Sequence, residues 1–198
     1  MFPNIILPDQ ILDHSVDLTE TVPLNVYLVK GTEKAAFIDS GLRDMHSDLR
    51  RLMRRHEIAP EQVAYILHTH SHHDHIGGTA QLADFTGARI VAPAAYAHWH
   101  SDWEAHYQEF ARPVPDLIPD TPALKKEVLG MLDLPHRVDH LCQEGEQFDL
   151  GGGIVLECVM FNGHMAAEAG WLERSSDTLL LGDVITVMDA PFIHGHVT

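Results

Sequence analysis

The chain has 198 residues, of which 45% are hydrophobic and 21% are charged, and this length and balance are those of one folded domain. They exclude intrinsically disordered and collagen-like chains. Thirteen Lys and Arg residues oppose 29 Asp and Glu residues, so the formal net charge is −16, and we expect no nucleic-acid partner and no membrane partner.

The first third of the chain predicts strands and one helix. Two β-rich runs, 24–29 and 35–38, are separated by a turn that is typical of a hairpin. Apolar residues from Met45 to Met53 recur at helical spacing, and arginines occupy the other faces of the predicted helix. We expect these arginines to form a solvated face: Arg50, Arg51, Arg54 and Arg55.

Strands and helices continue to alternate along the rest of the chain. Residues 63–67 and 89–92 predict short strands, and 79–85 predict a helix that Gly87 closes. Thr121 followed by Pro122 is typical of a helix start, and this helix is predicted to run through Leu132. Three further strands are predicted at 154–161, 170–173 and 178–181. Because no repeat or linker interrupts the alternation, residues 1–198 predict a single domain of the α/β class.

Histidine is unusually frequent, with 16 residues, and five of them lie between residues 68 and 75. Residues 70–75 read His-Ser-His-His-Asp-His, directly after a predicted buried strand and before two glycines. Several imidazoles and a carboxylate packed into six residues suit a divalent ion such as zinc, iron or manganese. His70 and His72 share one face of an extended stretch, whereas Asp74 and His75 follow the turn and can face an adjacent ion. The alternative is a solvated polar loop.

Residues 69–78 resemble the signature of the metallo-β-lactamase superfamily. Three further segments resemble that family in the expected order: residues 37–41, 162–164 and 181–183. The resemblance spans Asn25 to Asp183 and implies an αββα sandwich with a one-metal or two-metal site between its sheets.

The resemblance also implies a role for individual residues. His70, His72 and His164 would hold the first metal, Asp74 and His75 would hold the second, and Asp183 would bridge the two. Asp39 would orient a ligand or the loop that carries it.

The chain departs from the family pattern after Asp183, where the family usually supplies another histidine ligand from a distant loop. Only fifteen residues follow Asp183. Three explanations are open: His194 or His196 replaces that ligand, the second site is weakened, or the last C-terminal elements of the sandwich are missing. We expect the third.

The chemistry that the resemblance implies is hydrolysis by a metal-bound hydroxide, because a divalent ion lowers the pKa of bound water to about 7. The expected cofactors are two divalent ions, zinc first, with iron or manganese as alternatives. The substrate would be a small molecule with an ester, thioester or lactone group, and Asp74 would orient the water or shuttle a proton. The absence of cysteine from the metal motif, with Asp183 at the bridging position, favours the glyoxalase-II-like or lactonase-like branch over a true β-lactamase.

Two alternative functions remain. Some relatives hold a single iron and act as persulfide dioxygenases, and a fold of this kind could also serve as a non-catalytic metal-binding module.

Aromatic side chains recur between residues 99 and 110 at spacings of 4, 4 and 3, on one face of a predicted helix: Trp99, Trp103, Tyr107 and Phe110. We expect a packing stripe, with a substrate lid or a dimer contact as the alternatives. The histidines in the same stretch are predicted to lie on the helix surface: His98, His100 and His106.

Two cysteines, Cys142 and Cys158, occupy no metal-finger spacing and indicate no disulfide framework. No basic N-terminal segment with an apolar run and no membrane-length apolar stretch is present in the sequence. We therefore expect a cytoplasmic protein that acts alone or as a homodimer.

Overall fold

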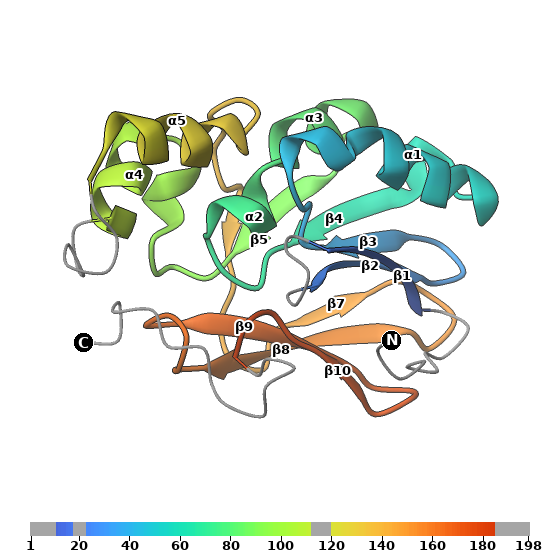
Figure 1. The fold of residues 1–198 in the computed structure, drawn as a ribbon. Helices are drawn as coiled ribbons and strands as arrows, with labels where there is room; N and C mark the ends of the chain where they lie inside the picture. Colours follow the sequence, from blue (N-terminus) through green and yellow to red (C-terminus); the bar gives the residue numbers. More distant parts are fainter. Residues whose placement is uncertain (1–10, 18–22, 112–119, 185–198) are drawn as a thin grey trace.

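The computed structural model describes residues 11–17, 23–111 and 120–184, and Figure 1 shows two β-sheets stacked face to face with helices over one of them. The first sheet has six strands in the order β1-β2-β3-β4-β5-β6. Their bounds are β1 Ile11–Asp17, β2 Pro23–Lys30, β3 Ala35–Ile38, β4 Val63–Leu67, β5 Arg89–Ala92 and β6 His140–Leu141. The second sheet has four antiparallel strands in the order β10-β9-β8-β7. Their bounds are β7 Gln147–Asp149, β8 Val155–Phe161, β9 Glu168–Glu173 and β10 Thr178–Leu180.

Helices cover the outer face of the six-stranded sheet and extend beyond one end of it (Figure 1). Their bounds are α1 His46–Arg55, α2 His73–Ile76, α3 Thr79–Thr86, α4 Trp103–Ala111 and α5 Pro122–Gly130. The described residues also form three short 3-10 helices: η1 Arg43–Met45, η2 Pro60–Gln62 and η3 Ala97–His100. In the described ranges no helix lies on the outer face of the four-stranded sheet (Figure 1). The α/β class and the two-sheet sandwich are confirmed.

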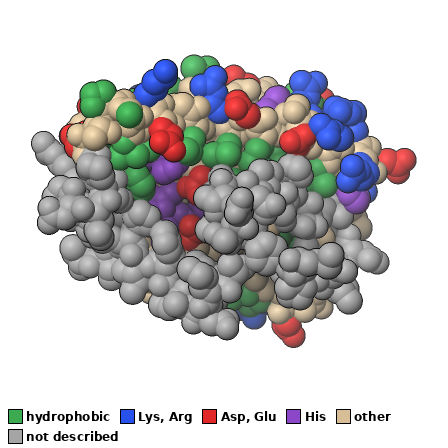
Figure 2. Space-filling model, viewed as in Figure 1, with side chains coloured by type: hydrophobic (Ala, Val, Ile, Leu, Met, Phe, Trp, Pro, Cys, Tyr) green, Lys and Arg blue, Asp and Glu red, His purple; other side chains and the backbone are tan. Residues whose placement is uncertain are grey.

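Helix α1 separates charged from apolar residues as predicted. Leu49, Leu52 and Met53 are buried, and the four arginines are exposed. Figure 2 shows Lys and Arg side chains gathered over the region that α1 occupies in Figure 1. The apolar face of α1 therefore anchors the helix, because burying each such side chain stabilises the fold by about 1.5–3 kcal/mol.

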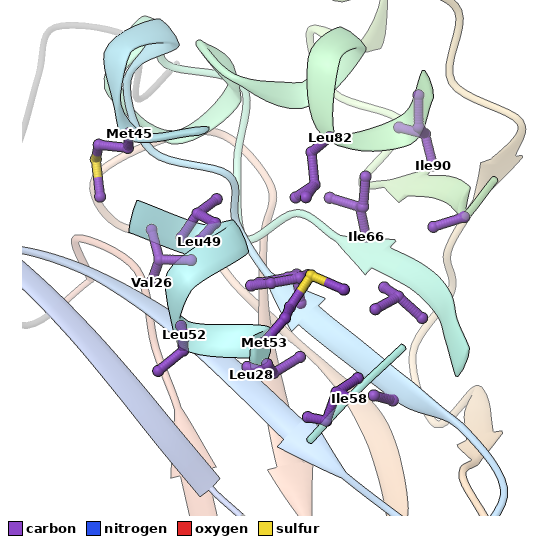
Figure 3. Close-up of a cluster of buried hydrophobic side chains, with 14 of the residues drawn as sticks. Val26, Leu28, Met45, Leu49, Leu52, Met53, Ile58, Ile66, Leu82 and Ile90 are labelled. Carbon is purple, nitrogen blue, oxygen red and sulfur yellow. The ribbon is translucent and has the colours of Figure 1, made fainter. Parts of the chain in front are cut away.

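Two hydrophobic clusters lie on opposite sides of the six-stranded sheet. Side chains of α1, α3 and the outer face of the sheet form the first cluster, and Figure 3 shows Leu49, Met53 and Leu82 among them. The second cluster lies between the sheets and includes Leu156 and Trp171. Successive strand residues point to opposite faces, which is why neighbours in β2 belong to different clusters.

Helix boundaries agree with the local signals in the sequence. The Thr121 hydroxyl accepts a hydrogen bond from the backbone N–H of Leu124, with Pro122 in the first turn of α5. Gly87 closes α3 with a left-handed φ of 76°. Helix α5 ends at Gly130 rather than at the predicted Leu132, because the last backbone bonds span three residues instead of four. Among the described residues, no helix combines the length and apolar character needed to cross a bilayer.

Candidate metal centre

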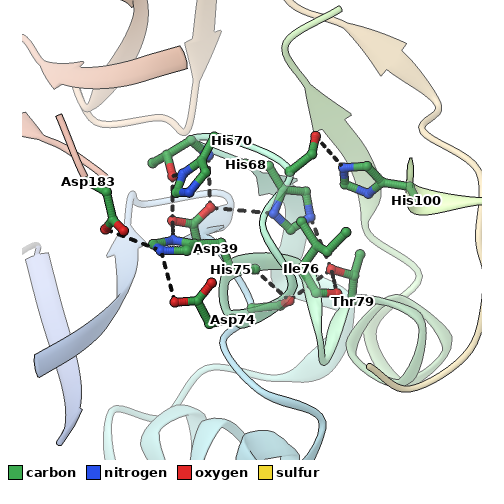
Figure 4. Close-up of polar contacts among 12 residues, drawn as sticks. Asp39, His68, His70, Asp74, His75, Ile76, Thr79, His100 and Asp183 are labelled. Carbon is green, nitrogen blue, oxygen red and sulfur yellow. Dashed lines mark hydrogen bonds and ion pairs between the residues drawn. The ribbon is translucent and has the colours of Figure 1, made fainter. Parts of the chain in front are cut away.

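The predicted ligands meet at one end of the sandwich, where strands of both sheets end. The loop after β4 and the short helix α2 carry the histidine cluster, and β3, β4 and β5 are parallel, so their carboxyl ends lie at one edge. The second sheet contributes His164, between β8 and β9, and Asp183, after β10. Figure 4 shows Asp183 facing His75 and His70 across this edge, and in Figure 2 histidine and acidic side chains are visible together in a recess of the surface.

One group of possible ligand atoms combines His70, His72 and His164. One ring nitrogen of each lies within 4.8 Å of the others, and all three residues are buried. The Nε2 atom of His164 lies 2.8 Å from Nδ1 of His72, so these two nitrogens face each other directly. The structure brings together the three residues predicted for the first ion.

A second group combines His70, His75 and Asp183, again with ligand atoms within 4.8 Å of one another. Nε2 of His75 lies 3.3 Å from Asp183 Oδ1. Because His70 belongs to both groups, the two candidate positions adjoin. The Asp183 side chain is 34% exposed, so this side of the site is open to solvent.

Asp74 lies beside the second group without belonging to it. Its Oδ2 atom is 3.8 Å from Nε2 of His75, and its side chain is 18% exposed. The role predicted for Asp74 as a metal ligand stays a prediction.

Hydrogen bonds that Asp39 accepts fix which nitrogen each of two ligand histidines presents, directly for His75 and through Thr69 for His70. The Thr69 hydroxyl donates to Asp39 Oδ2 at 2.8 Å, so its oxygen accepts from Nδ1–H of His70, 3.0 Å away. Nδ1–H of His75 donates directly to Asp39 Oδ2 at 2.8 Å. Both histidines therefore present Nε2 to the site, and this is the nitrogen that would bind a metal.

Carboxylates around His75 oppose the effect of its burial. Burial lowers the pKa of a histidine, but Asp183, Asp74 and Asp39 raise the pKa of His75 well above its ordinary value. Burial and the neighbouring charge of His75 hold the pKa of His70 well below its ordinary value. In the metal-free chain the proton is therefore held on His75, where a divalent ion would replace it.

The donor set fits a divalent ion. The Nε2 atom of His70 is buried and has no hydrogen-bond partner among the described residues, although it belongs to both groups of ligand atoms. A buried lone pair of this kind costs free energy unless something binds it. Neutral imidazole nitrogens together with a carboxylate oxygen suit zinc, iron or manganese.

A family model for the metallo-beta-lactamase superfamily matches residues 20–157 of the chain. The chain belongs to the metallo-beta-lactamase superfamily. A hydroxyacylglutathione hydrolase of Pseudomonas aeruginosa is 62% identical over 33 residues, which are 17% of this chain and 13% of that enzyme. A metal-dependent hydrolase of Agrobacterium fabrum is 51% identical over 43 residues, which are 22% of this chain and 18% of that protein.

Solved structures of the superfamily share this fold over most of the chain. A metallo-beta-lactamase family protein of Thermus thermophilus has a TM-score of 0.77 and 20% identity, covering 98% of this chain and 66% of that one. A motif mutant of a metallo-beta-lactamase from Cronobacter sakazakii has a TM-score of 0.60 and 27% identity, covering 83% of this chain and 59% of that one. The chain thus spans less than two thirds of the length of these superfamily members.

Glu168, a buried carboxylate near the site, was not identified from the sequence. Its Oε1 atom accepts a hydrogen bond from the backbone N–H of Met165 at 2.7 Å, which closes the turn that carries His164. Burial, with a smaller contribution from the charge of Asp183, raises the pKa of Glu168 to about 7. The available signal was a glutamate in an otherwise apolar segment just after His164.

The aromatic stripe packs beside the ligand loop. Trp99, Tyr107 and Phe110 are buried in a third hydrophobic cluster with Val128 of α5 and Met165, which follows His164. The ring of His72 lies 5.6 Å from that of Phe110. The expected packing stripe is confirmed for these three aromatic residues, and it holds α4 and α5 against the site.

The surface prediction for the neighbouring histidines is wrong for two of the three. His98 is exposed and pairs with Glu109 at 2.9 Å, but His100 and His106 are fully buried. The predicted single helix is divided at Ser101, because Asp102 accepts a hydrogen bond from the backbone N–H of Ala105 and starts a new helix. The break changes the direction in which these side chains point, and the Ser-Asp pair was the signal for it.

The sequence also contains a histidine before the cluster, two cysteines and two C-terminal histidines. His68 is buried, with Nε2 3.1 Å from the Thr79 hydroxyl and Nδ1 3.4 Å from Asp39 Oδ1. Both cysteines are buried and free of disulfide bonds. His194 and His196 lie outside the described residues.

Proposed function

We propose that the chain is a metal-dependent hydrolase that cleaves a small ester, thioester or lactone. The observation that carries this proposal is the pair of adjoining ligand groups that share His70, each with its atoms within 4.8 Å of one another. The similarity of a short segment to hydroxyacylglutathione hydrolase supports a thioester as the first substrate to test.

The proposed ligand set divides the two groups between two ions and adds Asp74 to the second. His70, His72 and His164 would hold one ion, and His75, Asp74 and Asp183 would hold a second, with Asp183 between the two. Zinc is the ion that we propose for both positions, because the donors are imidazole and carboxylate. When bound, such ions lower the pKa of a coordinated water and polarise the substrate carbonyl.

The carboxylates of the site have separate tasks in the proposed reaction. Asp74, at the edge of the site and 18% exposed, would accept the proton of the attacking water and pass it to the leaving group. Asp39 has no contact with solvent and would keep His70 and His75 in their metal-binding tautomers. The net charge of −16 favours a small-molecule substrate over a nucleic acid.

Metal content and thioester hydrolysis test the proposal directly. Elemental analysis of protein purified without added metal should give close to two zinc ions per chain. The His72→Ala and Asp183→Ala variants should lose metal and at least about 100-fold in kcat/KM, while keeping the circular dichroism of a folded domain. The exposed His98, which forms an ion pair with Glu109 and belongs to neither ligand group, provides the matched control His98→Ala.

Three outcomes would contradict the proposal. A single iron per chain, with oxygen consumed in the presence of a persulfide, would favour the dioxygenase alternative. Bound metal without hydrolysis of any ester, thioester or lactone would favour a binding module. Full metal content in both the His72→Ala and Asp183→Ala variants would remove the proposed ligand set.

A further inference from the structure

Two histidines outside the proposed ligand set form a chain of hydrogen bonds that reaches the ligand loop. The Ser71 hydroxyl lies 3.2 Å from Nε2 of His100. Nδ1 of His100 lies 2.9 Å from Nε2 of His136, and Nδ1 of His136 lies 3.1 Å from the carbonyl oxygen of Leu134. This series of hydrogen bonds thus begins at Ser71, between His70 and His72, and ends in the segment after α5.

The direction of every hydrogen bond in this chain follows from its last acceptor. A carbonyl oxygen only accepts, so Nδ1–H of His136 donates to Leu134 and Nε2 of His136 accepts from Nδ1–H of His100. Nε2 of His100 is then an acceptor, and the Ser71 hydroxyl donates to it. The hydroxyl of Ser71 therefore has its direction set by the tautomer of His100.

Burial and packing keep both imidazoles neutral and in place. His100 and Ser71 are almost completely buried, and the backbone N–H of His136 donates to the carbonyl of His100 at 2.8 Å. Burial, with the neighbouring histidines, holds the pKa of His100 well below its ordinary value, and burial lowers the pKa of His136 to about 4. Figure 4 shows His100 on the far side of His68 from His70, so it lies behind the site rather than in it.

We propose that His100 is a positioning residue for the metal centre: by accepting the hydrogen bond of Ser71 it fixes the backbone between His70 and His72. This inference rests on the proposed function, because it takes His70 and His72 to be ligands of one ion. Two ligands separated by one residue can bind the same ion only if that residue holds its conformation. Groups that orient metal ligands affect metal affinity even though they do not touch the ion.

Two substitutions at His100 separate its two hydrogen bonds. In His100→Gln the side-chain oxygen takes the place of Nε2 and still accepts from Ser71, whereas the bond to His136 is lost. In His100→Asn the side-chain amide takes the place of Nδ1 and still donates to His136, whereas the bond from Ser71 is lost. Ser71→Ala removes the hydroxyl itself.

The readout is the zinc dissociation constant, measured by competition with a chromogenic chelator, with the absorption spectrum of the cobalt-substituted protein as a record of ligand geometry. Ser71→Ala and His100→Asn should raise the dissociation constant about 10- to 100-fold and alter the cobalt spectrum, whereas His100→Gln should stay within about threefold of the wild type. The thermal unfolding temperature of each metal-free variant reports folding separately, and His98→Ala is the control.

The outcomes distinguish this inference from the function on which it rests. Wild-type zinc affinity in Ser71→Ala, or equal losses in His100→Gln and His100→Asn, would overturn the positioning role while leaving the metal site intact. A wild-type chain that binds no zinc or cobalt would overturn the proposed function and this inference together. If Ser71→Ala unfolds, the zinc dissociation constants of His100→Gln and His100→Asn alone test the positioning role.

Discussion

Asp39 accepts three hydrogen bonds, from the backbone N–H and hydroxyl of Thr69 and from Nδ1–H of His75. One buried carboxylate thereby sets the orientation of two proposed ligands, directly for His75 and through Thr69 for His70. An amide cannot replace it, because an amide nitrogen in place of one oxygen would meet a donor with a donor. The chemistry at this position depends on charge and acceptor number rather than on size.

The Asp39→Asn variant tests this dependence. Asparagine tolerates the left-handed φ of 61° that Asp39 adopts, so the substitution isolates the carboxylate from the backbone. We expect zinc affinity to fall about 10- to 100-fold, and the metal-free chain to lose about 1–3 kcal/mol in urea unfolding because buried donors lose their acceptor. Asp44, whose side chain is 91% exposed, provides the control Asp44→Asn. Unchanged zinc affinity in Asp39→Asn would remove the orienting role.

At the scale of elements, Gly77 permits the close approach of α2 to the segment that follows α5. A Cβ atom at this position would lie 2.3 Å from the carbonyl oxygen of Met131 and 2.7 Å from that of His73. The backbone N–H of Asp133 also donates to the carbonyl of Gly77 at 2.8 Å. Because the neighbouring atoms are backbone, they cannot move aside as a flexible side chain would.

Gly77→Ala should therefore destabilise the chain by about 3 kcal/mol or more, measured by urea unfolding. Gly130, the last residue of α5, is the matched control, since a Cβ atom there would meet nothing within 4 Å. Gly130→Ala should leave stability unchanged or raise it by up to about 1 kcal/mol, because alanine is the better helix former. Equal stability of the two variants would show that the backbone around Gly77 has room for a Cβ atom.

The elements that the sequence predicted are those with a local cause. Strand β4 and helix α1 follow from apolar periodicity. The end of α3 follows from Gly87, and the start of α5 follows from Thr121 and Pro122. Strands β1, β6 and β7 were missed, because the pairing with a neighbouring strand that defines each of them has no local signal in the sequence. The same limit applies to β9, which begins at Glu168 rather than at Gly170.

The residues of the candidate site also differ in whether a local sequence signal could predict them. The clustered histidines could be predicted because His70, His72 and His75 lie within six residues of one another. The contribution of His100 could not, because it depends on the break at Ser101 and on a partner, His136, that lies 36 residues away. Residues that orient the ligands come from several elements, and only the folded chain brings them together.

At the scale of the whole molecule, the buried titratable groups predict how the stability of the metal-free chain depends on pH. Burial lowers the pKa of three histidines in the folded chain: His70, His100 and His136. Below about pH 6.5 these side chains therefore bind protons in the unfolded chain but stay neutral in the folded chain. These three histidines therefore lower stability as the pH drops below about 6.5. Glu168 opposes them, because its pKa, raised to about 7 by burial, lets the folded chain take up a proton before the unfolded chain does. His75 also opposes the three histidines: its raised pKa contributes stability that is present below about pH 6.5 and is lost as the pH rises through the folded-state value.

Asp39 adds a second loss at lower pH. Burial would raise its pKa, but the charge of His75, its hydrogen bond to Asp39 and the nearby His68 hold it well below the ordinary value. Its contribution is present above about pH 4 and is lost as the pH falls further. The buried histidines and Asp39 thus both lower stability in acid, the histidines below about pH 6.5 and Asp39 below about pH 4.

Urea unfolding of the metal-free chain in the presence of a chelator measures this profile. Because His136 has a folded-state pKa of about 4, it should account for about 3 kcal/mol of the loss between pH 7 and pH 4. The His136→Gln variant should therefore show a shallower decline over this range. Zinc should steepen the profile of the wild type, because binding requires the proton of His75 to leave and a bound ion stabilises only the folded chain. An equal dependence on pH in the wild type and in His136→Gln would contradict the burial of a neutral His136.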